Sequence, residues 1–197
     1  LADLDGNIIA KTKNETRAAE GSDRVIGRMI QSIRDILAEN GARVDELAAL
    51  GLGIPGQQDS EKGICISAHN LGWVNLQVLE PFKEALGIPV VMGNDVRVAT
   101  LGELKYGAGR GIRNFICITI GTGIGSGLVL NGQLFKGPAG LAGELGHINV
   151  VPDGDPCLCG SRGCLEAYAS SYGMVRIAKE SISRGEKSLM EEMTQGD

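Results

Sequence analysis

The strongest constraint on the fold of this chain is a short window that carries the side chains of a complete metal site. One nitrogen donor and three sulfur donors follow one another there, from His147, Cys157, Cys159 and Cys164. A tetrahedral zinc site takes this donor set, and four protein ligands leave no position open for water. The glycines and prolines between the ligands suit a loop that wraps around an ion. The window therefore predicts a structural zinc ion.

A disulfide is the alternative use of these cysteines, with one pair bonded and one thiol left free. Only one residue separates Cys157 from Cys159, which is poor geometry for pairing them with each other. No stretch reads as a signal peptide, so we expect a reducing compartment and favour zinc. The other two cysteines, Cys65 and Cys117, lie in apolar runs and are expected to be small core residues.

The charge balance and the apolar pattern exclude two classes of partner. The net charge is −5 and 22% of the residues are charged, with acids and bases interspersed. No basic stripe suggests a nucleic-acid surface in this segment, and no apolar run approaches the length of a membrane span. We expect a globular, cytoplasmic protein. Most of the 30 glycines lie between Gly87 and Gly163, which suggests backbone that approaches a ligand.

Strand and helix patterns alternate along the chain, which is typical of an α/β fold. Apolar spacing and capping residues predict helices over 22–40, 76–86, 94–106, 139–145, 165–169 and 171–183. Apolar runs and turn signals predict strands over 7–13, 47–53, 63–67, 89–92, 114–120, 125–130 and 133–135. Because Asn131-Gly132 signals a hairpin, the sheets should be mixed rather than purely parallel.

A glycine-rich stretch over 107–111 marks a change of pattern and predicts a domain boundary. We expect one domain over 1–110 and a second over 111–197. Both ends read as incomplete, because the opening hairpin lacks most of its first strand and the last residues form a polar, helix-like piece. We therefore expect a fragment of a longer chain.

Asn94-Asp95 lies where a buried strand ends and a helix begins. Ligands of open α/β sheets bind at the carboxyl ends of strands, so this is a suitable place for a catalytic base. Asp95 could accept a proton from a substrate hydroxyl, as an aspartate does in phosphoryl transfer. The alternative is a plain helix cap, and position alone favours the cap.

A glycine-rich turn, Gly121-Thr122-Gly123-Ile124-Gly125, joins two predicted strands. Backbone N–H groups and a threonine hydroxyl in such a turn can hold phosphate oxygens. The turn is neither a P-loop nor a dinucleotide fingerprint, since it lacks the Gly-Lys ending and a strand follows it. A tight β-turn without a ligand is the alternative.

Two acids, Glu144 and Glu166, stand at the edges of the metal window and are not needed by the metal. If one imidazole nitrogen of His147 binds zinc, the other stays available to a hydroxyl. Carboxylates with an imidazole and an asparagine form a good pocket for sugar hydroxyls, because each donates or accepts directionally.

Together these motifs resemble the ROK family of sugar kinases and sugar-responsive repressors, and within it the bacterial glucokinase type. The motifs, in the family's order, are Ile54-Pro55-Gly56, Asn70-Leu71-Gly72-Trp73, Gly93-Asn94-Asp95, the 121–125 turn, Gly143-Glu144-Leu145-Gly146-His147 and Cys157-x-Cys159-Gly160-x-x-Gly163-Cys164-Leu165-Glu166. The last two together are highly specific.

The resemblance implies an actin/hexokinase-like (ribonuclease H-like) fold, in which two α/β domains close over a cleft. The small N-terminal domain would cover 1–110, and part of the large domain, with the zinc loop, would cover 111–197. The implied reaction is phosphoryl transfer from ATP with Mg²⁺ to a hexose, with glucose as the expected sugar. The implied assembly is a homo-oligomer, a dimer or a tetramer.

The resemblance also assigns roles to residues, and it raises Asp95 from a cap to the catalytic base. Substrate-binding positions are matched by Gly56, Asn70, Asn94, Asp95, Glu144, His147 and Glu166. Phosphate-binding positions are matched by Gly121, Thr122, Gly123 and Gly125, and the zinc ligands by His147, Cys157, Cys159 and Cys164. The family's first phosphate loop and its adenine contacts are expected outside this segment, which by itself should be inactive.

Two other functions use the same scaffold. One is the sugar-sensing domain of a transcriptional repressor, which needs a helix-turn-helix region upstream. The other is the kinase half of a bifunctional amino-sugar enzyme. The kinase is the favoured hypothesis, because a pure sensor would be free to lose Asp95.

Overall fold

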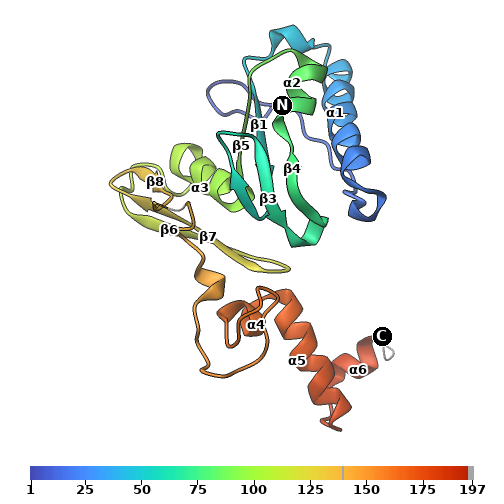
Figure 1. Cartoon of the computed structure of the whole chain (residues 1–197), viewed down its shortest axis with the longest axis vertical. Coiled ribbons are helices and arrows are strands. Elements are labelled where there is room, and N and C mark those ends of the chain that lie inside the picture. The colour runs from blue at the N-terminus through green and yellow to red at the C-terminus, as the bar shows by residue number, and fades with distance from the viewer. Residues whose placement is uncertain (139, 195–197) are drawn as a thin grey trace. The chain divides into compact units, whose positions relative to one another are not determined.

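The computed structural model describes residues 1–138 and 140–194. The chain forms two compact units, Leu1–Arg110 and Gly111–Asp197 (Figure 1). Within the described residues, no helix is both long enough and apolar enough to cross a membrane.

The first unit combines a parallel strand pair with an antiparallel sheet of three strands. β1 (Leu50–Ile54) pairs in parallel with β5 (Val90–Asn94). The antiparallel sheet has the order β2-β3-β4, with β2 at Gln57–Asp59, β3 at Ile64–Ala68 and β4 at Trp73–Gln77. The mixture of parallel and antiparallel pairs confirms the α/β class with mixed sheets.

Three α-helices accompany these strands. α1 spans Ser22–Glu39, α2 spans Leu79–Leu86 and α3 spans Asp95–Tyr106. Short 3₁₀ turns occupy Ala18–Glu20, Val44–Glu46 and His69–Leu71. α1 is amphipathic, and it buries Val25 and Ile26 in a core shared with Phe82 of α2. The two helices pack against each other in this unit (Figure 1).

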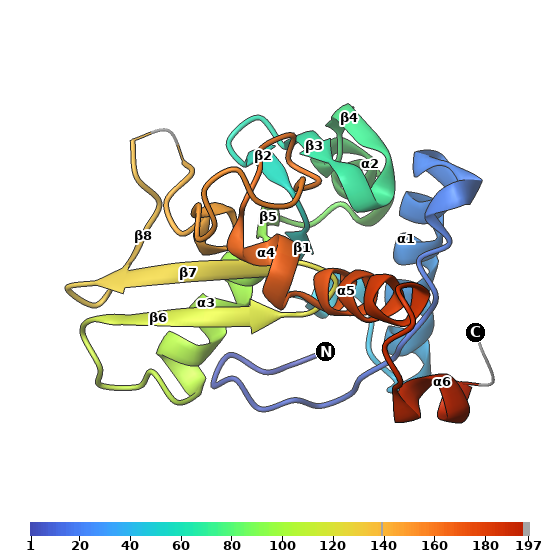
Figure 2. The same cartoon turned by 90° about the horizontal axis from the view of Figure 1, so that it is seen from below.

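The second unit begins with an antiparallel meander. β6 (Phe115–Ile120), β7 (Ile124–Leu130) and β8 (Gln133–Phe135) lie in that order (Figure 2). The predicted hairpin at Asn131-Gly132 joins β7 to β8, and both residues have positive φ, 54° and 79°, as a type I′ turn requires. A 3₁₀ turn (Leu145–His147) and the helices α4 (Leu165–Ala169), α5 (Ser171–Ser183) and α6 (Leu189–Thr194) follow.

Three sequence predictions of local structure are wrong. Residues 7–13 form only an isolated bridge, Ala2↔Ile8, because only the first residues of the chain lie opposite them. The helix predicted from 76 begins at Leu79, because the preceding residues pair with β3. No α-helix covers the described part of 139–145, since Gly140 and Gly143 have φ of +67° and +92°, and Leu145 only begins a 3₁₀ turn; Ala139 lies outside the described residues.

Candidate functional site

In the first unit, the candidate catalytic residue stands at the carboxyl edge of the parallel strand pair. The register places Ile54 of β1 opposite Asn94 of β5, so both strands end at the same edge. Gly56 follows β1, and Asp95 is the first residue of α3. This is the edge at which ligands bind in open α/β sheets.

Asn94, and not Asp95, caps α3. The Asn94 Oδ1 atom accepts a hydrogen bond from the backbone N–H of Arg97 at 3.2 Å. Its Nδ2 atom donates to the carbonyl oxygen of Gly56 at 3.3 Å. Asp95 is exposed, and its carboxylate accepts from the N–H of Val96 at 2.9 Å. The cap that sequence position favoured for Asp95 is therefore filled by its neighbour.

At Gly56, just after β1, the backbone passes very close to the end of β3. Its φ is +84°, and a Cβ there would lie 2.1 Å from the carbonyl oxygen of Ser67 and 2.9 Å from Cα of Ala68. Only glycine permits this approach without moving backbone. Asn70 lies two residues beyond Ala68, in the 3₁₀ turn, and is exposed. Gly56 thus lies in a loop that contacts Asn94 at the end of β5, and the end of β3 that it approaches leads into the 3₁₀ turn with Asn70.

In the second unit, the structure brings the four predicted metal ligands together. The ligand atoms of His147, Cys157, Cys159 and Cys164 all lie within 4.8 Å of one another. The His147 Nδ1 atom is 3.8 Å from Sγ of Cys157. The sulfurs of Cys159 and Cys164 are also 3.8 Å apart, too far for a disulfide bond. A tetrahedron with metal–sulfur bonds of about 2.3 Å has edges of about 3.8 Å, so the donor set fits a tetrahedral ion.

Backbone hydrogen bonds bring the two ends of this metal loop (residues 147–164) together. The N–H of Leu165 donates to the carbonyl oxygen of Ile148 at 3.0 Å, and the N–H of Cys157 donates to Ser161 at 2.8 Å. Gly163 has φ +71°, and a Cβ there would lie 1.8 Å from the carbonyl oxygen of Val151. The predicted loop around an ion therefore depends on a glycine beside Cys164.

The cysteine environments differ in burial and in charge preference. Burial, and then the neighbouring Cys159 and Cys164 thiols, raise the pKa of Cys157 to about 12. Cys159 is more exposed. The partial burial of its thiol tends to raise its pKa, but hydrogen bonds from the backbone N–H of Ser161 and from the neighbouring thiols outweigh this effect, so the pKa of Cys159 is lowered. Since metals bind thiolates, a cation at this place would displace a proton from Cys157. Outside the loop, Cys65 is fully buried as predicted, whereas Cys117 is half-buried.

Two glycines allow the segment that carries Glu144 and His147 to pack closely against β7. A Cβ on Gly143 would lie 2.6 Å from the carbonyl oxygen of Ser126, and one on Gly146 would lie 2.2 Å from that of Ile124. The hydroxyl of Ser126 also donates to the carbonyl oxygen of Gly143. Glu144 and His147 are both exposed. Because Nδ1 of His147 faces Cys157, Nε2 is the nitrogen left for a hydroxyl.

The glycine turn between β6 and β7 is held from two sides. Oε2 of Glu166 accepts from the N–H of Ile124 at 2.7 Å. Ser171, at the start of α5, donates to the carbonyl oxygen of Gly121 from its N–H at 2.9 Å and from its hydroxyl at 2.8 Å. No motif distinguishes Ser171, so its contact with Gly121 could not be predicted from the sequence. The exposed part of the turn includes Gly121 and Thr122.

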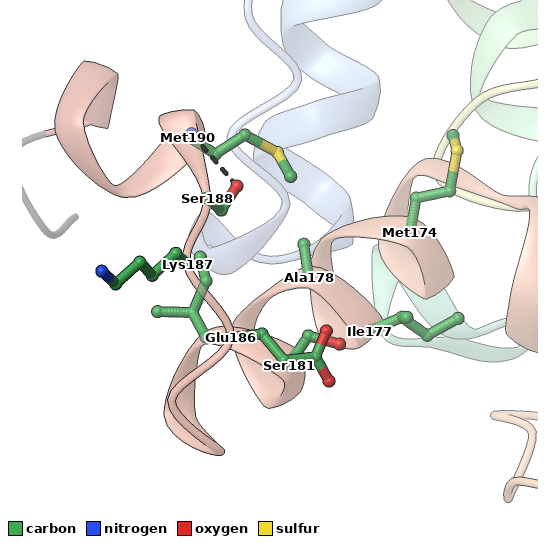
Figure 3. Close-up of a pocket in the computed structure, with 9 residues that line it drawn as sticks. Met174, Ile177, Ala178, Ser181, Glu186, Lys187, Ser188 and Met190 are labelled. Carbon is green, nitrogen blue, oxygen red and sulfur yellow. Dashed lines mark hydrogen bonds between the residues drawn. The ribbon is translucent and has the colours of Figure 1, made fainter.

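A separate hollow of about 390 Å³ lies between α5 and α6. Figure 3 shows side chains of α5, among them Met174 and Ala178, and those of the segment leading into α6. None of the predicted site residues lines this hollow. We therefore assign it no part in the candidate site.

Comparison with known proteins places these features in context. A model of the ROK family matches residues 1–197. A glucokinase of Halalkalibacterium halodurans is 37% identical over 186 residues, which cover 94% of this chain and 56% of that protein. A xylose repressor of Bacillus subtilis is 30% identical over 191 residues, which cover 96% of this chain and 48% of the repressor. The chain thus spans about half the length of these relatives.

Solved structures agree with the sequence matches. The crystal structure of a ROK family glucokinase from Streptomyces griseus, in complex with glucose and AMPPNP, superimposes with a TM-score of 0.77 at 35% identity. The match covers 93% of this chain and 56% of that glucokinase. The chain is therefore similar to that glucokinase in fold and identical to it at about a third of the matched positions.

Proposed function

The chain belongs to the ROK family and has its actin/hexokinase-like α/β fold, and we propose that the complete protein phosphorylates a hexose with ATP. Glucose is the proposed sugar, because glucokinases are among the relatives. We further propose that Leu1–Arg110 corresponds to the small domain and Gly111–Asp197 to part of the large domain. The proposed assembly is a homo-oligomer.

The position of Asp95 carries this proposal. Its carboxylate is exposed at the carboxyl edge of β5, and Asn94 already caps the helix. Asp95 accepts the proton of the hexose hydroxyl while the hydroxyl oxygen bonds to the γ-phosphorus and the bond to the ADP oxygen breaks. ATP with Mg²⁺ supplies the phosphoryl group. The relevant feature of Asp95 is therefore a carboxylate that the local fold does not use as a cap.

The remaining predicted residues divide between the sugar and the phosphates. Sugar hydroxyls are bound by Gly56, Asn70, Asn94, Glu144, His147 and Glu166. Carboxylates accept hydrogen bonds from hydroxyls, and the Nε2–H of a zinc-bound imidazole donates one. Phosphate oxygens are held by the turn formed by Gly121, Thr122, Gly123 and Gly125. The exposure of Gly121 and Thr122 supports this role.

Zinc is the proposed structural metal of the loop. His147 would bind it through Nδ1, and Cys157, Cys159 and Cys164 through their sulfurs, as the 3.8 Å separations support. With four protein ligands the ion supplies rigidity and takes no part in phosphoryl transfer. It would hold His147 in one orientation toward the sugar.

A panel of hexoses tests the proposal directly. The complete protein is incubated with ATP, Mg²⁺ and each sugar at millimolar concentration, and ADP release is followed. We expect glucose-dependent ADP formation that exceeds the rate without sugar. A protein that forms no ADP with any hexose would not be the proposed kinase.

A sugar-sensing repressor is the second candidate, since a xylose repressor is 30% identical to this chain. Calorimetry distinguishes the two functions. Sugar binding without ADP formation would favour the sensor. The coding sequence ahead of Leu1 gives an independent test, because a repressor requires a DNA-binding region there.

A further inference from the structure

A charged contact fastens the metal loop to the helix that follows it. Arg176 lies on α5, and Asp155 lies in the loop two residues before Cys157. Nη2 of Arg176 is 2.6 Å from Oδ2 of Asp155, and the arginine side chain is only 20% exposed. A charge-assisted hydrogen bond of this length, partly shielded from water, is stronger than an exposed ion pair.

The same guanidinium reaches two other groups. Nη2 also donates to the carbonyl oxygen of Ala167 on α4 at 3.2 Å. Nη1 donates to both carboxylate oxygens of Glu180, one helical turn further along α5, at 2.8 and 3.0 Å. Because the donors of arginine form a rigid planar fork, these contacts fix its orientation. Arg176 thus connects the metal loop, α4 and α5.

Asp155 is also held through its backbone. Its N–H donates to the hydroxyl of Tyr168, on α4, at 2.6 Å. Its carbonyl oxygen accepts from the N–H of Gly163, in the other arm of the loop, at 2.8 Å. Gly154 makes room for this contact, since a Cβ there would lie 2.1 Å from the Tyr168 hydroxyl. The two cysteine-bearing arms therefore meet at Asp155.

We propose that Arg176 is a positioning residue for the metal loop. Through Asp155 it sets where the loop presents Cys157, and through Ala167 it ties that position to α4, which also carries Glu166. The inference rests on the proposed zinc site. Arg176 acts through Asp155 and not on the metal itself, so its removal should change the metal site without removing a ligand.

The first test measures zinc release to a chromogenic chelator from the complete protein. Arg176→Gln removes both the charge and the fork, and we expect release about 10-fold faster than in the wild type. Arg176→Lys keeps the charge and should be intermediate. Glu180→Gln is the matched control: it removes the charge of the pair within α5 but keeps an acceptor oxygen for Nη1 of Arg176 and leaves the contact with Asp155, so it should release zinc at the wild-type rate.

Cobalt substitution separates positioning from general destabilisation. We expect Arg176→Gln to shift the visible d–d bands of the cobalt protein, because the sulfur positions change. Asp155→Asn should produce the same shift, and the double variant should shift the bands no further. A variant that lowers only the melting temperature and keeps the bands of the wild type would show a role in stability alone and would overturn the inference.

The outcomes distinguish this inference from the metal site on which it rests. If the wild-type protein binds neither zinc nor cobalt, the proposed site itself is wrong. If it binds one ion per chain, but Arg176→Gln and Asp155→Asn release zinc at the wild-type rate with unchanged cobalt bands, the metal site stands and the positioning role is wrong. Asp155→Asn keeps the test decisive should Arg176→Gln fail to fold.

Discussion

Glu166 on α4 accepts a hydrogen bond from the backbone N–H of Ile124, with 2.7 Å between Oε2 and the nitrogen. Glu166 lies two residues after Cys164, and Ile124 is the first residue of β7, directly after the glycine turn. Within the described part of the chain, Ile124 supplies the one hydrogen bond to this carboxylate. The contact therefore joins the metal loop, a proposed sugar ligand and a proposed phosphate turn.

Substitutions of Glu166 should separate its two roles. Glu166→Gln retains a carbonyl oxygen for the N–H of Ile124 but loses the charge, so we expect a raised KM for the sugar and little change in the KM for ATP. Glu166→Ala removes the charge and also the acceptor for the N–H of Ile124, so the KM should rise for the sugar and for ATP. A hydrogen bond to a charged group contributes about 1.5–3 kcal/mol, or about 10-fold and more in KM. Steady-state kinetics with each substrate varied checks this, and equal effects of the two variants would contradict it.

A pair of glycines in the turn offers a matched comparison. A Cβ on Gly123 would lie 2.5 Å from Oε2 of Glu166, whereas one on Gly121 would meet nothing within 4 Å. Gly123→Ala should displace the carboxylate and reduce kcat/KM about 10-fold by loss of the hydrogen bond to Ile124. Gly121→Ala should leave the hydrogen bond from Ile124 to Glu166 intact, so its loss of kcat/KM should be clearly smaller than that of Gly123→Ala. Kinetics on both variants tests this, and similar losses in both would refute the steric account.

Removal of the metal should destabilise the second unit. Cys159 is exposed, so Cys159→Ser removes a ligand without leaving a cavity in a core. We expect it to lower the zinc content below one per chain and to lower the melting temperature by about 5 °C or more. Cys117→Ser, outside the cluster, is the control and should retain zinc. Metal analysis and calorimetry measure both, and full zinc content in Cys159→Ser would argue against the ligand set.

Gly56 should tolerate no side chain. Its φ of +84° and the 2.1 Å approach of a Cβ to the Ser67 carbonyl oxygen both oppose alanine. The left-handed backbone alone costs about 1–2 kcal/mol for a residue other than glycine, and the clash adds to it. Gly56→Ala should therefore unfold more readily in urea and bind sugar more weakly. Gly51→Ala, on the adjoining β1 with nothing within 4 Å, should behave like the wild type in both assays.

The metal cluster could be predicted from the sequence because its ligands lie close together along the chain and their types are diagnostic. The same holds for the hairpin at Asn131-Gly132, whose two positive φ angles follow from those residues. The role of Asp95 was harder to predict from the sequence, because asparagine and aspartate cap helices equally well. Only the hydrogen bond from the Arg97 N–H to Asn94 identified the cap.

Other features depend on contacts that no local pattern records. The residues of the bond from Ile124 to Glu166 are 42 positions apart, and those of the bond from Ser171 to Gly121 are 50 apart. The sequence near Leu76 has helical spacing, yet pairing with β3 makes it a strand, because tertiary hydrogen bonds override a weak local preference. The extent of β4 could therefore not be predicted from its own residues.

The role of Asp95 as general base is tested by the turnover of Asp95→Asn with glucose and ATP, combined with calorimetric measurement of glucose affinity. If Asp95 is the general base, kcat should fall by about 10²–10⁴-fold, while the dissociation constant for glucose changes only a few-fold. Asp23→Asn, which alters an acid in the first turn of α1, controls for the loss of charge at a helix N-terminus and should leave kcat unchanged. Wild-type turnover in Asp95→Asn would contradict the account.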